Sequence, residues 1–404
     1  MEKELFTVAL GIEAPLYIDK IELNDSDREL HVYIDFQRGG RFSCSECKTT
    51  GLPVHDTVDK MWRHLNFFQY KCYLHMRTPR TKCPDCGERL WIPPWGRKQS
   101  GFTVLFEAFV MTLAKAMPIS QLSALVDEQD TRLWRIVKYH VDRAKTRKTY
   151  SMVTKIGCDE TSSRRGHNYV TVFADMQSGE VIYATEGKDA KTIKAFTEEL
   201  PKHGAQPEQI KEITIDMSPA FIAGTTAHLP QASITFDKFH VIQALNKAQD
   251  EVRRIEQKGN PLLKNTRYVW LKNPKNLTEK QGQKLETLRY ENLKTAKVYQ
   301  MKLTFQDIYR NITDPREAEI ALKKWLAWAV RSRLDPIRAF AKTVKNHFAG
   351  ILRYFSSRLT SGAMEGLNSR IQGIKRKARG FRNINNFITM IYLETAGLEF
   401  ELPT

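Results

Sequence analysis

Three acidic residues, far apart in the sequence, have the type and setting to act together on a substrate. Asp159 follows a short apolar run, Asp216 ends the stretch KEITID, and Glu365 lies in SGAMEGLNSRIQGIKRKARGF. Carboxylates that are brought close together repel one another and raise each other's pKa unless a cation lies between them. Mg²⁺ prefers oxygen ligands, and two such ions about 3.5–4 Å apart assist attack on a phosphodiester. We therefore expect two Mg²⁺ per site, which Mn²⁺ can replace.

The elements around these acids indicate how they would meet. In TKIGCDETSS, a short apolar run typical of a strand ends with Asp159 and Glu160. Further runs typical of strands are the two halves of NYVTVFADMQSGEVIYATEG, KEITID and ASITFD, with helical stretches before and after KEITID. This order of strands and helices is that of a ribonuclease H-like sheet, in which the first and fourth strands are central neighbours. Asp159 and Asp216 would then end adjacent strands. The alternative is that both aspartates only cap the loops that follow their strands.

Glu365 would reach the same place from a helix that begins near Ala363. Leu367, Ile371 and Ile374 recur at helical spacing and would pack on the sheet, which leaves Glu365 on another face near the N-terminal end. Asn368 follows it at helical spacing. The alternative for Glu365 is an acid favoured by the helix macrodipole. The basic residues that we expect to hold a DNA backbone beside the acids are Lys375, Arg376, Lys377, Arg379 and Arg382.

Two cysteine pairs predict a second metal site, of a different kind. Cys44 and Cys47 in CSEC, and Cys83 and Cys86 in CPDC, have the two-residue spacing that lets both sulfurs face one zinc ion. Four sulfurs leave no open position, so this one Zn²⁺ would be structural. Three histidines are alternatives to a cysteine ligand, namely His55, His64 and His75, and four unrelated free thiols are a further alternative. The other cysteines, Cys72 and Cys158, read as buried, inert thiols.

Charge and helical pattern favour double-stranded DNA as the partner. The chain of 404 residues has 63 Lys and Arg against 46 Asp and Glu, a net charge of +17 that attracts polyanions. Residues 118–148 read as a short helix, a turn and a longer helix, which is the outline of a helix-turn-helix whose second helix enters the major groove. Arg132, Arg135 and Lys138 would face the DNA. A plain helical hairpin with a basic face is the alternative.

Composition limits the remaining classes. Hydrophobic residues make up 41% of the chain and charged residues 27%, which is typical of a globular protein with real cores. No apolar run approaches the roughly 20 residues of a membrane span, and the N-terminus lacks the pattern of a signal peptide. We expect a protein without a membrane partner that stays in the cytoplasm.

Four stretches in order resemble a known family. GCDETS, ITIDMSPAF, DKFHVIQAL and SGAMEGLNSRIQGIKRKARGFRN, behind a cysteine-knuckle region and a helix-turn-helix, look like the ISL-three family of bacterial insertion-sequence transposases of the DDE class. The resemblance implies that Asp159, Asp216 and Glu365 are the catalytic carboxylates. It also implies that Asp237 and His240 line the pocket behind them, a supporting role that we also assign to Asn368.

The resemblance implies a fold and an activity. The expected fold is α/β plus α, with a ribonuclease H-like catalytic core interrupted by an all-helical insertion. The expected activity is cleavage of the element's ends at its inverted repeats, followed by attack of the freed 3′-hydroxyl on target DNA by a homodimer or higher assembly. Two alternatives remain: a DNA-binding transcriptional regulator with an inactive nuclease-like core, and a nuclease that cuts without joining. The expected domains are 1–100 (zinc-binding), 101–150 (helix-turn-helix), 151–240 (first part of the core), 241–355 (helical insertion) and 356–404 (C-terminal core helix with Glu365).

Overall fold

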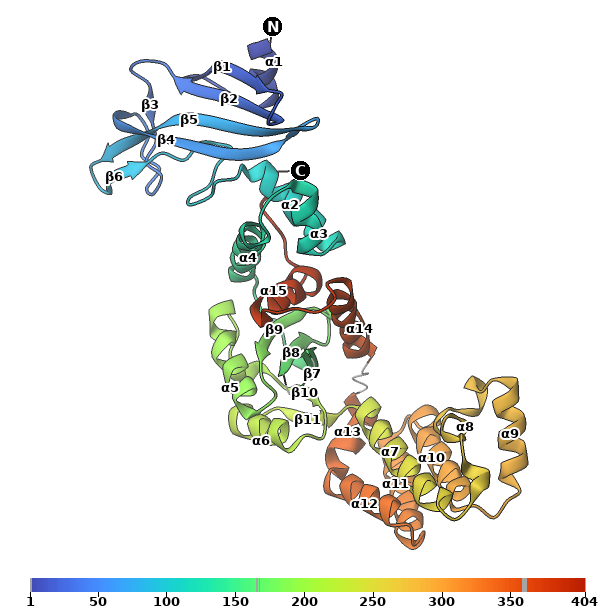
Figure 1. Ribbon diagram of the computed structural model, residues 1–404. Coiled ribbons are helices and arrows are strands. Elements are labelled where there is room, and N and C mark those ends of the chain that lie inside the picture. Colours follow the sequence, from blue (N-terminus) through green and yellow to red (C-terminus); the bar gives the residue numbers. More distant parts are fainter. Residues whose placement is uncertain (1, 165, 167, 358–361, 404) are drawn as a thin grey trace. The chain divides into compact units, whose positions relative to one another are not determined.

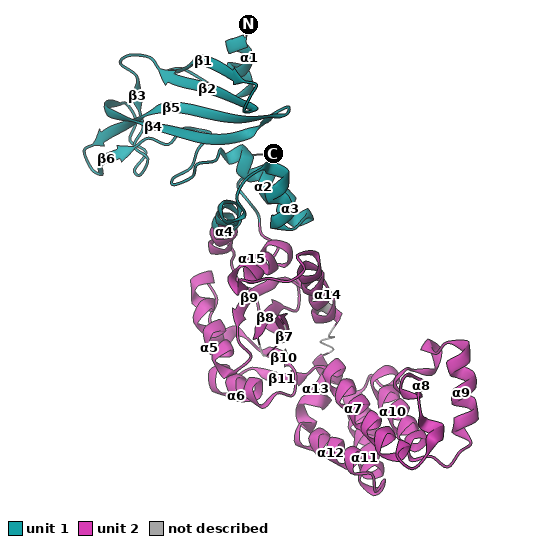
Figure 2. Ribbon diagram, in the orientation of Figure 1, with its two compact units in different colours: residues 1–140, 399–404 teal, residues 141–398 magenta. Residues whose placement is uncertain are grey.

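The computed structural model describes residues 2–164, 166, 168–357 and 362–403 (Figure 1). It divides into two compact units, which are described separately: unit 1 comprises residues 1–140 with 399–404, and unit 2 comprises residues 141–398 (Figure 2). None of the helices in the described ranges is long and apolar enough to span a membrane.

Unit 1 is built on a six-stranded sheet. Its strand order is β1-β2-β5-β4-β3, with β6 also paired to β5. The pairing of β2 with β5 is parallel and the other pairs are antiparallel. The bounds are α1 Glu2–Ala9, β1 Leu16–Asn24, β2 Glu29–Phe36, β3 Arg41–Phe42, β4 Leu52–Phe67, β5 Tyr70–Cys83 and β6 Gly87–Leu90.

Alternation along two neighbouring strands builds the core of this sheet. Leu30, Val32 and Ile34 on β2 are buried, and the register places them opposite Cys72, Leu74 and Met76 of β5, which are also buried. Successive side chains of a strand point to opposite faces, so three residues from each strand share one apolar layer. The hairpin β4–β5 also lies between the two cysteine pairs in the sequence.

Two further helices of unit 1 are α2 Val104–Ala116 and α3 Ile119–Val126, and they are followed by α4 Asp130–Thr146, which belongs to unit 1 up to His140. Thr103 caps α2 by accepting a hydrogen bond from the amide of Phe106, and Asp127 ends α3 in a left-handed conformation. Leu133, Ile136 and Val137 of α4 are buried. The predicted short helix, turn and longer helix are thus present at the predicted residues.

Unit 2 contains a five-stranded sheet in the order β11-β10-β7-β8-β9. Strands β7, β8 and β9 are antiparallel neighbours, while β10 is parallel to both β7 and β11. The first and fourth strands are therefore central neighbours, as predicted. The bounds are β7 Lys155–Arg164, β8 Asn168–Asp175, β9 Val181–Glu186, β10 Glu212–Ile215 and β11 Ser233–Phe236.

Helices pack on both faces of this sheet. The helices between its strands are α5 Ala190–Glu199 and α6 Pro219–His228, with the short 3-10 helices η1 Leu200–His203 and η2 Pro207–Gln209. Phe196 of α5 stacks on Phe173 of β8 at 4.4 Å between ring centroids. The C-terminal helices are α14 Gly362–Lys377 and α15 Ile384–Thr395, and the Tyr392 hydroxyl of α15 accepts a hydrogen bond from the amide of Ala184 in β9.

The chain between β11 and α14 is helical over its described length. Gly350 of α13 lies so close to the Phe236 ring that a Cβ there would be 2.6 Å from it, so glycine permits α13 to rest on β11. Trp270 and Trp325 are buried in this region. Its elements are α7 Lys238–Gln257, η3 Pro261–Leu263, α8 Arg267–Leu271, η4 Pro274–Asn276, α9 Glu279–Arg289, α10 Lys294–Asn311, α11 Pro315–Arg331, α12 Asp335–Asn346 and α13 Phe348–Ser357.

Candidate active site

Asp159 and Asp216 lie abreast on the two central strands of unit 2. The last parallel pair between β7 and β10 joins Gly157 to Thr214, and each aspartate is two residues further along its own strand direction. One detail of the prediction is wrong, because β7 does not end at Asp159. It continues to Arg164 through antiparallel pairing with β8, so that Asp159 is an interior residue of β7 located where its pairing with β10 has ended.

Helix α14 packs on β7 and runs parallel to it. Met364 packs on Gly157, Asn368 donates a hydrogen bond to Oδ2 of Asp159, and Nε2 of Gln372 donates to the Thr161 hydroxyl at 2.7 Å. Four helical residues rise about 6 Å and two strand residues about 6.6 Å, so residues four apart on the helix match residues two apart on the strand. This match fixes where along the strand each residue of α14 stands.

Glu365 sits in the first turn of α14, next to the buried Met364. As predicted, Leu367, Ile371 and Ile374 are buried, and Glu365 is exposed on another side of the helix. Its charge acts on the start of α7, where it helps to raise the pKa of Asp237. Glu365 therefore belongs to the electrostatic surroundings of Asp237, the residue that follows β11.

His240 provides a positive charge among the acids. Its Nε2 lies 3.6 Å from Oδ1 of Asp159 and 3.9 Å from Oδ2 of Asp237. The interaction with Asp159 outweighs the effect of burial and raises the pKa of His240 to about 9. Asp237 itself caps α7 by accepting a hydrogen bond from the amide of Phe239 at 2.8 Å. The Asp-x-x-His stretch thus brings one acid and one imidazolium to the two aspartates.

The acids are more numerous than the cations that face them. Burial raises the pKa of Asp216, Asp237 and Glu160, and the neighbouring Asp159 carboxylate adds to all three shifts. Among the described residues, the acids do not form a group of three or more with all ligand oxygens within 4.8 Å of one another. A cluster of partly buried carboxylate oxygens with raised pKa values has the donor chemistry that a hard divalent cation requires.

The basic residues predicted at the end of α14 and just after it divide into two groups. Lys375 and Lys377 are engaged within the protein, because the Lys375 ammonium donates to the Ser162 carbonyl at 2.6 Å and Lys377 pairs with Glu394 at 2.8 Å. The other three are exposed and extend beyond the site: Arg376, Arg379 and Arg382.

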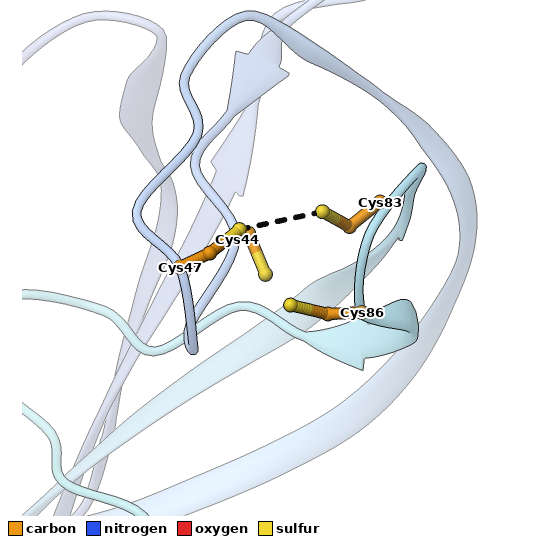
Figure 3. A group of neighbouring side chains, drawn as sticks. All are labelled: Cys44, Cys47, Cys83 and Cys86. Carbon is orange, nitrogen blue, oxygen red and sulfur yellow. Dashed lines mark hydrogen bonds between the residues drawn. The ribbon is translucent and has the colours of Figure 1, made fainter.

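The cysteines of unit 1 form the metal-ligand group that the sequence predicted (Figure 3). The sulfurs of Cys44, Cys47, Cys83 and Cys86 all lie within 4.8 Å of one another, and those of Cys47 and Cys83 are 3.4 Å apart. A tetrahedral zinc with bonds of about 2.3 Å places its sulfurs roughly 3.8 Å apart, so the group fits a structural zinc ion.

The histidine alternatives are not needed to complete this group. His55 faces Glu88 at 3.3 Å, His64 hydrogen-bonds to Thr103 at 2.9 Å and His75 contacts His31 at 2.9 Å. Cys72 and Cys158 are buried, and burial raises the pKa of the Cys72 thiol to about 11 and that of Cys158 well above its usual value. Both are inert thiols, as predicted.

The candidate DNA-contacting residues of α4 also differ in their surroundings. Arg135 and Lys138 are exposed. Arg132 pairs with Glu128 at 2.5 Å and lies over the Phe102 ring at 4.3 Å, so much of its side chain serves the fold of unit 1.

Two contributors to the acidic centre were missed from the sequence. Gly157 admits Met364 because a Cβ there would be 2.6 Å from the Met364 sulfur, and Glu160 adds a further carboxylate. The signal for Gly157 was a glycine inside an apolar strand, which marks a close approach. The sequence offered no comparable signal for the role of Glu160.

Comparison with known proteins agrees with this arrangement. A family model described as "Transposase", for the DDE class of ISL3, matches residues 156–391. A helix-turn-helix domain of transposase family ISL3 matches residues 92–141, and a zinc-finger of transposases IS204, IS1001, IS1096 and IS1165 matches residues 40–86.

Whole-length relatives carry the same description. The transposase for insertion sequence element IS1001 of Bordetella parapertussis is 28% identical over 393 residues, which cover 93% of this chain and 94% of the relative. The transposase for element IS1557 of Mycobacterium tuberculosis is 27% identical over 439 residues, covering 99% and 97%.

A solved structure of a simian T-cell lymphotropic virus intasome with a PP2A regulatory subunit matches 46% of this chain and 66% of that chain at 17% identity. Its TM-score is 0.19, which is too low to support an inference about the fold. The family model, in contrast, spans more than half of the sequence, and on that ground the chain belongs to the ISL3 family of DDE transposases.

Proposed function

We propose that unit 2 carries the catalytic site of this transposase, and that Asp159, Asp216 and Glu365 hold two divalent cations there. Mg²⁺ is the proposed ion and Mn²⁺ its substitute. The observation that carries the proposal is the parallel register of β7 and β10, which sets Asp159 beside Asp216 where their pairing ends. The sheet order and the helical region between β11 and α14 support a ribonuclease H-like core with a helical insertion.

The chain's own residues prepare the acids for this task. Asn368 donates to Oδ2 of Asp159, and the Glu160 amide donates to Oδ1 of the same carboxylate at 2.8 Å, so both oxygens are held in place. The Ser218 amide donates to Oδ1 of Asp216 at 2.9 Å. His240 lies beside Oδ1 of Asp159 and offsets part of the negative charge. The cations, when bound, would supply activation of the attacking oxygen and stabilisation of the leaving oxygen.

The DNA would be held by cations at the edge of the site and by unit 1. Arg376, Arg379 and Arg382 are placed to contact phosphates, which gives affinity without sequence information. Arg135 and Lys138 of α4 are the proposed contacts to the element's inverted repeats. The proposed domains keep their expected bounds: 1–100 (zinc-binding), 101–150 (helix-turn-helix), 151–240 (first part of the core), 241–355 (helical insertion) and 356–404 (C-terminal core helix).

The proposed reaction has two steps at one site. Water first cleaves a strand at each element end and frees a 3′-hydroxyl, and that hydroxyl then attacks a phosphodiester of the target DNA. Handling two ends calls for a homodimer or larger assembly on DNA, associated with the nucleoid. A regulator with an inactive core is not favoured, because the comparisons are with transposases.

The test uses a labelled end fragment, a target plasmid and Mg²⁺. We expect Glu365→Gln to bind the end fragment as the unaltered protein does, and to lose both cutting and joining. Glu279→Gln, the same change at an exposed acid of α9, is the control and should keep both reactions. Cutting by Glu365→Gln at an unchanged rate would refute the assignment, while cutting without joining in the unaltered protein would identify a nuclease.

The cysteine group is proposed to hold one structural zinc per chain. Elemental analysis of the purified protein should find one zinc, and Cys44→Ser should lose it because three thiolates and a hydroxyl bind far more weakly. Cys72→Ala removes a buried thiol outside the group and should keep the ion. A metal content that is the same in both variants would contradict the proposal.

A further inference from the structure

An apolar groove runs between α11 and α12 on the helical region of unit 2. Its volume is about 800 Å³. Its floor is formed by five apolar side chains, and Val330 among them is 55% exposed. Apolar surface left open in this way is typical of a protein-binding site. The floor residues are Leu326, Ala327, Val330, Ala341 and Phe348.

The rim of this groove is entirely basic. Lys323 and Arg331 stand on α11, and Arg338, Lys342 and Lys345 stand on α12, with no acidic residue among the lining side chains. Two of these cations have an acidic partner on their own helix, outside the lining: Lys323 lies 2.5 Å from Glu319, and Arg338 lies 3.9 Å from Asp335. Nε of Arg331 donates to the Ala327 carbonyl and Nε of Arg338 to the Val330 carbonyl, both at 3.1 Å. These bonds hold both guanidinium groups beside the floor. The groove therefore fits an apolar ligand that has negative charges at its edges.

Helix α1 presents such a surface. Its inner side packs on unit 1 through Phe6, whose ring lies 5.3 Å from that of Phe67, and through Lys3, which donates to the Asp19 carbonyl. Leu5 and Val8 point away from this packing and are 63% and 81% exposed.

The outer side of α1 has acids at both edges. At 100° per residue, Leu5, Val8 and Ala9 share one side, with Glu2 at one edge and Glu4 at the other. Both glutamates are exposed, and none of the described residues of α1 is buried. The outer surface of α1 is thus a short apolar stripe with an acid at each edge.

We propose that α1 of one protomer docks in the α11/α12 groove of a second protomer. The eight residues of α1 span about 12 Å, and so do the residues of α11 from Lys323 to Arg331 that line the groove. Leu5 and Val8 would cover the apolar floor, while Glu2 and Glu4 would face the basic rim. An amphipathic helix laid in an apolar groove is a recurring mode of recognition.

This contact is independent of the catalytic assignment, since none of its residues belongs to the acidic centre. DNA is a weaker candidate for the groove. Its phosphates could pair with the rim, but they are polar and would offer the five apolar floor residues no apolar contact. The pairing supplies a surface for the assembly that two element ends require. It also predicts that self-association weakens with salt, because the rim charges are exposed and screened.

The test measures self-association of the full-length protein by sedimentation over a range of concentrations without DNA. Leu5→Asp in α1 and Val330→Asp in the groove should each weaken association at least about tenfold, because each places a charge in an apolar contact. Leu23→Asp and Ile255→Asp are matched controls, as both residues are 57% exposed and lie outside the two surfaces. Both controls should associate as the unaltered protein does.

Mixing the two variants asks whether the surfaces bind each other. A Val330→Asp protomer keeps an intact α1, and a Leu5→Asp protomer keeps an intact groove, so a mixture contains one undamaged contact that neither variant has alone. We expect the mixture to associate more strongly than either variant.

Three results would overturn the proposal. The first is a protein that stays monomeric at all concentrations, and the second is a mixture no stronger than its components. The third is a Val330→Asp variant that loses DNA affinity while self-association is unchanged, which would assign the groove to DNA.

Discussion

Buried carboxylates occur in both units, and their surroundings differ. In unit 1, Glu107 of α2 is fully buried and accepts hydrogen bonds from Nε of Arg97 at 2.7 Å, from His140 at 2.7 Å and from Ser100 at 2.6 Å. Burial raises the pKa of Glu107, but the bonds from His140, Arg97 and Ser100 outweigh it and the net shift is downward. This carboxylate is fully supplied with donors by the protein itself.

In unit 2, Asp216 and Asp237 have fewer hydrogen-bond donors than Glu107 among the described residues. Asp216 and Asp237 each accept a hydrogen bond from one backbone amide, and Nε2 of His240 lies 3.6 Å from Asp159. The net pKa shifts of Asp216 and Asp237 are upward. A carboxylate with all its partners stabilises a fold, whereas a group of under-supplied carboxylates retains the capacity to bind cations. The contrast separates the structural role of Glu107 from the cation-binding role that we propose for Asp216.

The largest expected effect is the loss of chemistry at the acidic centre. Asp216→Asn should lower Mg²⁺-dependent cleavage at least about a thousandfold, because a lost metal ligand forfeits several kcal/mol of transition-state stabilisation. The same change should leave the metal-free stability of unit 2 equal or higher, since it removes a charge whose burial is unfavourable. End-cleavage assays and calorimetry check the two halves. If Asp216→Asn destabilised unit 2, Asp216 would stabilise the fold as Glu107 does, and the comparison between the two units would fail.

Glu107→Gln should have the opposite effect: it should destabilise unit 1 and leave the cleavage chemistry intact. The change leaves the Arg97 guanidinium without its anion and removes the carboxylate that accepts from His140, and breaking a buried ion pair of this kind costs about 3–5 kcal/mol. Calorimetry should show the unit 1 transition lowered while that of unit 2 is unchanged. The cleavage chemistry of pre-bound ends should persist. A unit 1 that melts as before would mean that the hydrogen bonds of Glu107 do not stabilise it.

Mg²⁺ should act on one unit only. An ion that binds the folded state stabilises it by about 2.7 kcal/mol at a concentration one hundred times its dissociation constant. The unit 2 transition should therefore rise on addition of Mg²⁺, and the unit 1 transition should not. Asp216→Asn provides the control, in which the rise should shrink or vanish. Equal shifts in both units would point to a general salt effect.

The smallest expected effect is on the pH dependence of folding stability, to which Glu107 and Asp216 should contribute with opposite sign. The folded pKa of Glu107 is lowered from its ordinary value of 4.5, so its contribution to stability is present above that value and is lost as pH falls through the folded pKa. The folded pKa of Asp216 is raised from 3.8, so its penalty is present above the raised pKa and is relieved as pH falls through it. Each pKa unit is worth about 1.4 kcal/mol.

Mg²⁺-free calorimetry between pH 3 and pH 7 can measure both dependences against the two variants. The destabilisation caused by Glu107→Gln should shrink towards low pH, and so should the stabilisation caused by Asp216→Asn. Two differences of the same sign at neutral pH would contradict the comparison.

Local patterns were sufficient for much of the fold. The helices at Ile119–Val126 and Asp130–Thr146, the strand after Lys211 and the buried stripe of α14 all follow from periodicity and turn residues. The strand that contains Asp159 was predicted too short, because its end depends on the pairing of β7 with β8 and not on its own apolar run. Where a strand ends because of its pairing with a neighbouring strand, local sequence patterns do not predict the end.

The sequence by itself determined which residue types are available: two cysteine knuckles, three separated acids and an excess of basic charge. These follow from side-chain chemistry and short spacings, which do not depend on the rest of the chain. Only the tertiary structure decided that all four cysteines form one group, that Asn368 holds Asp159, and that Glu107 has all its donors while Asp216 has too few. Such pairings join residues as much as 209 positions apart, and a desolvated charge is stabilised or penalised by whatever the fold places within a few ångströms of it.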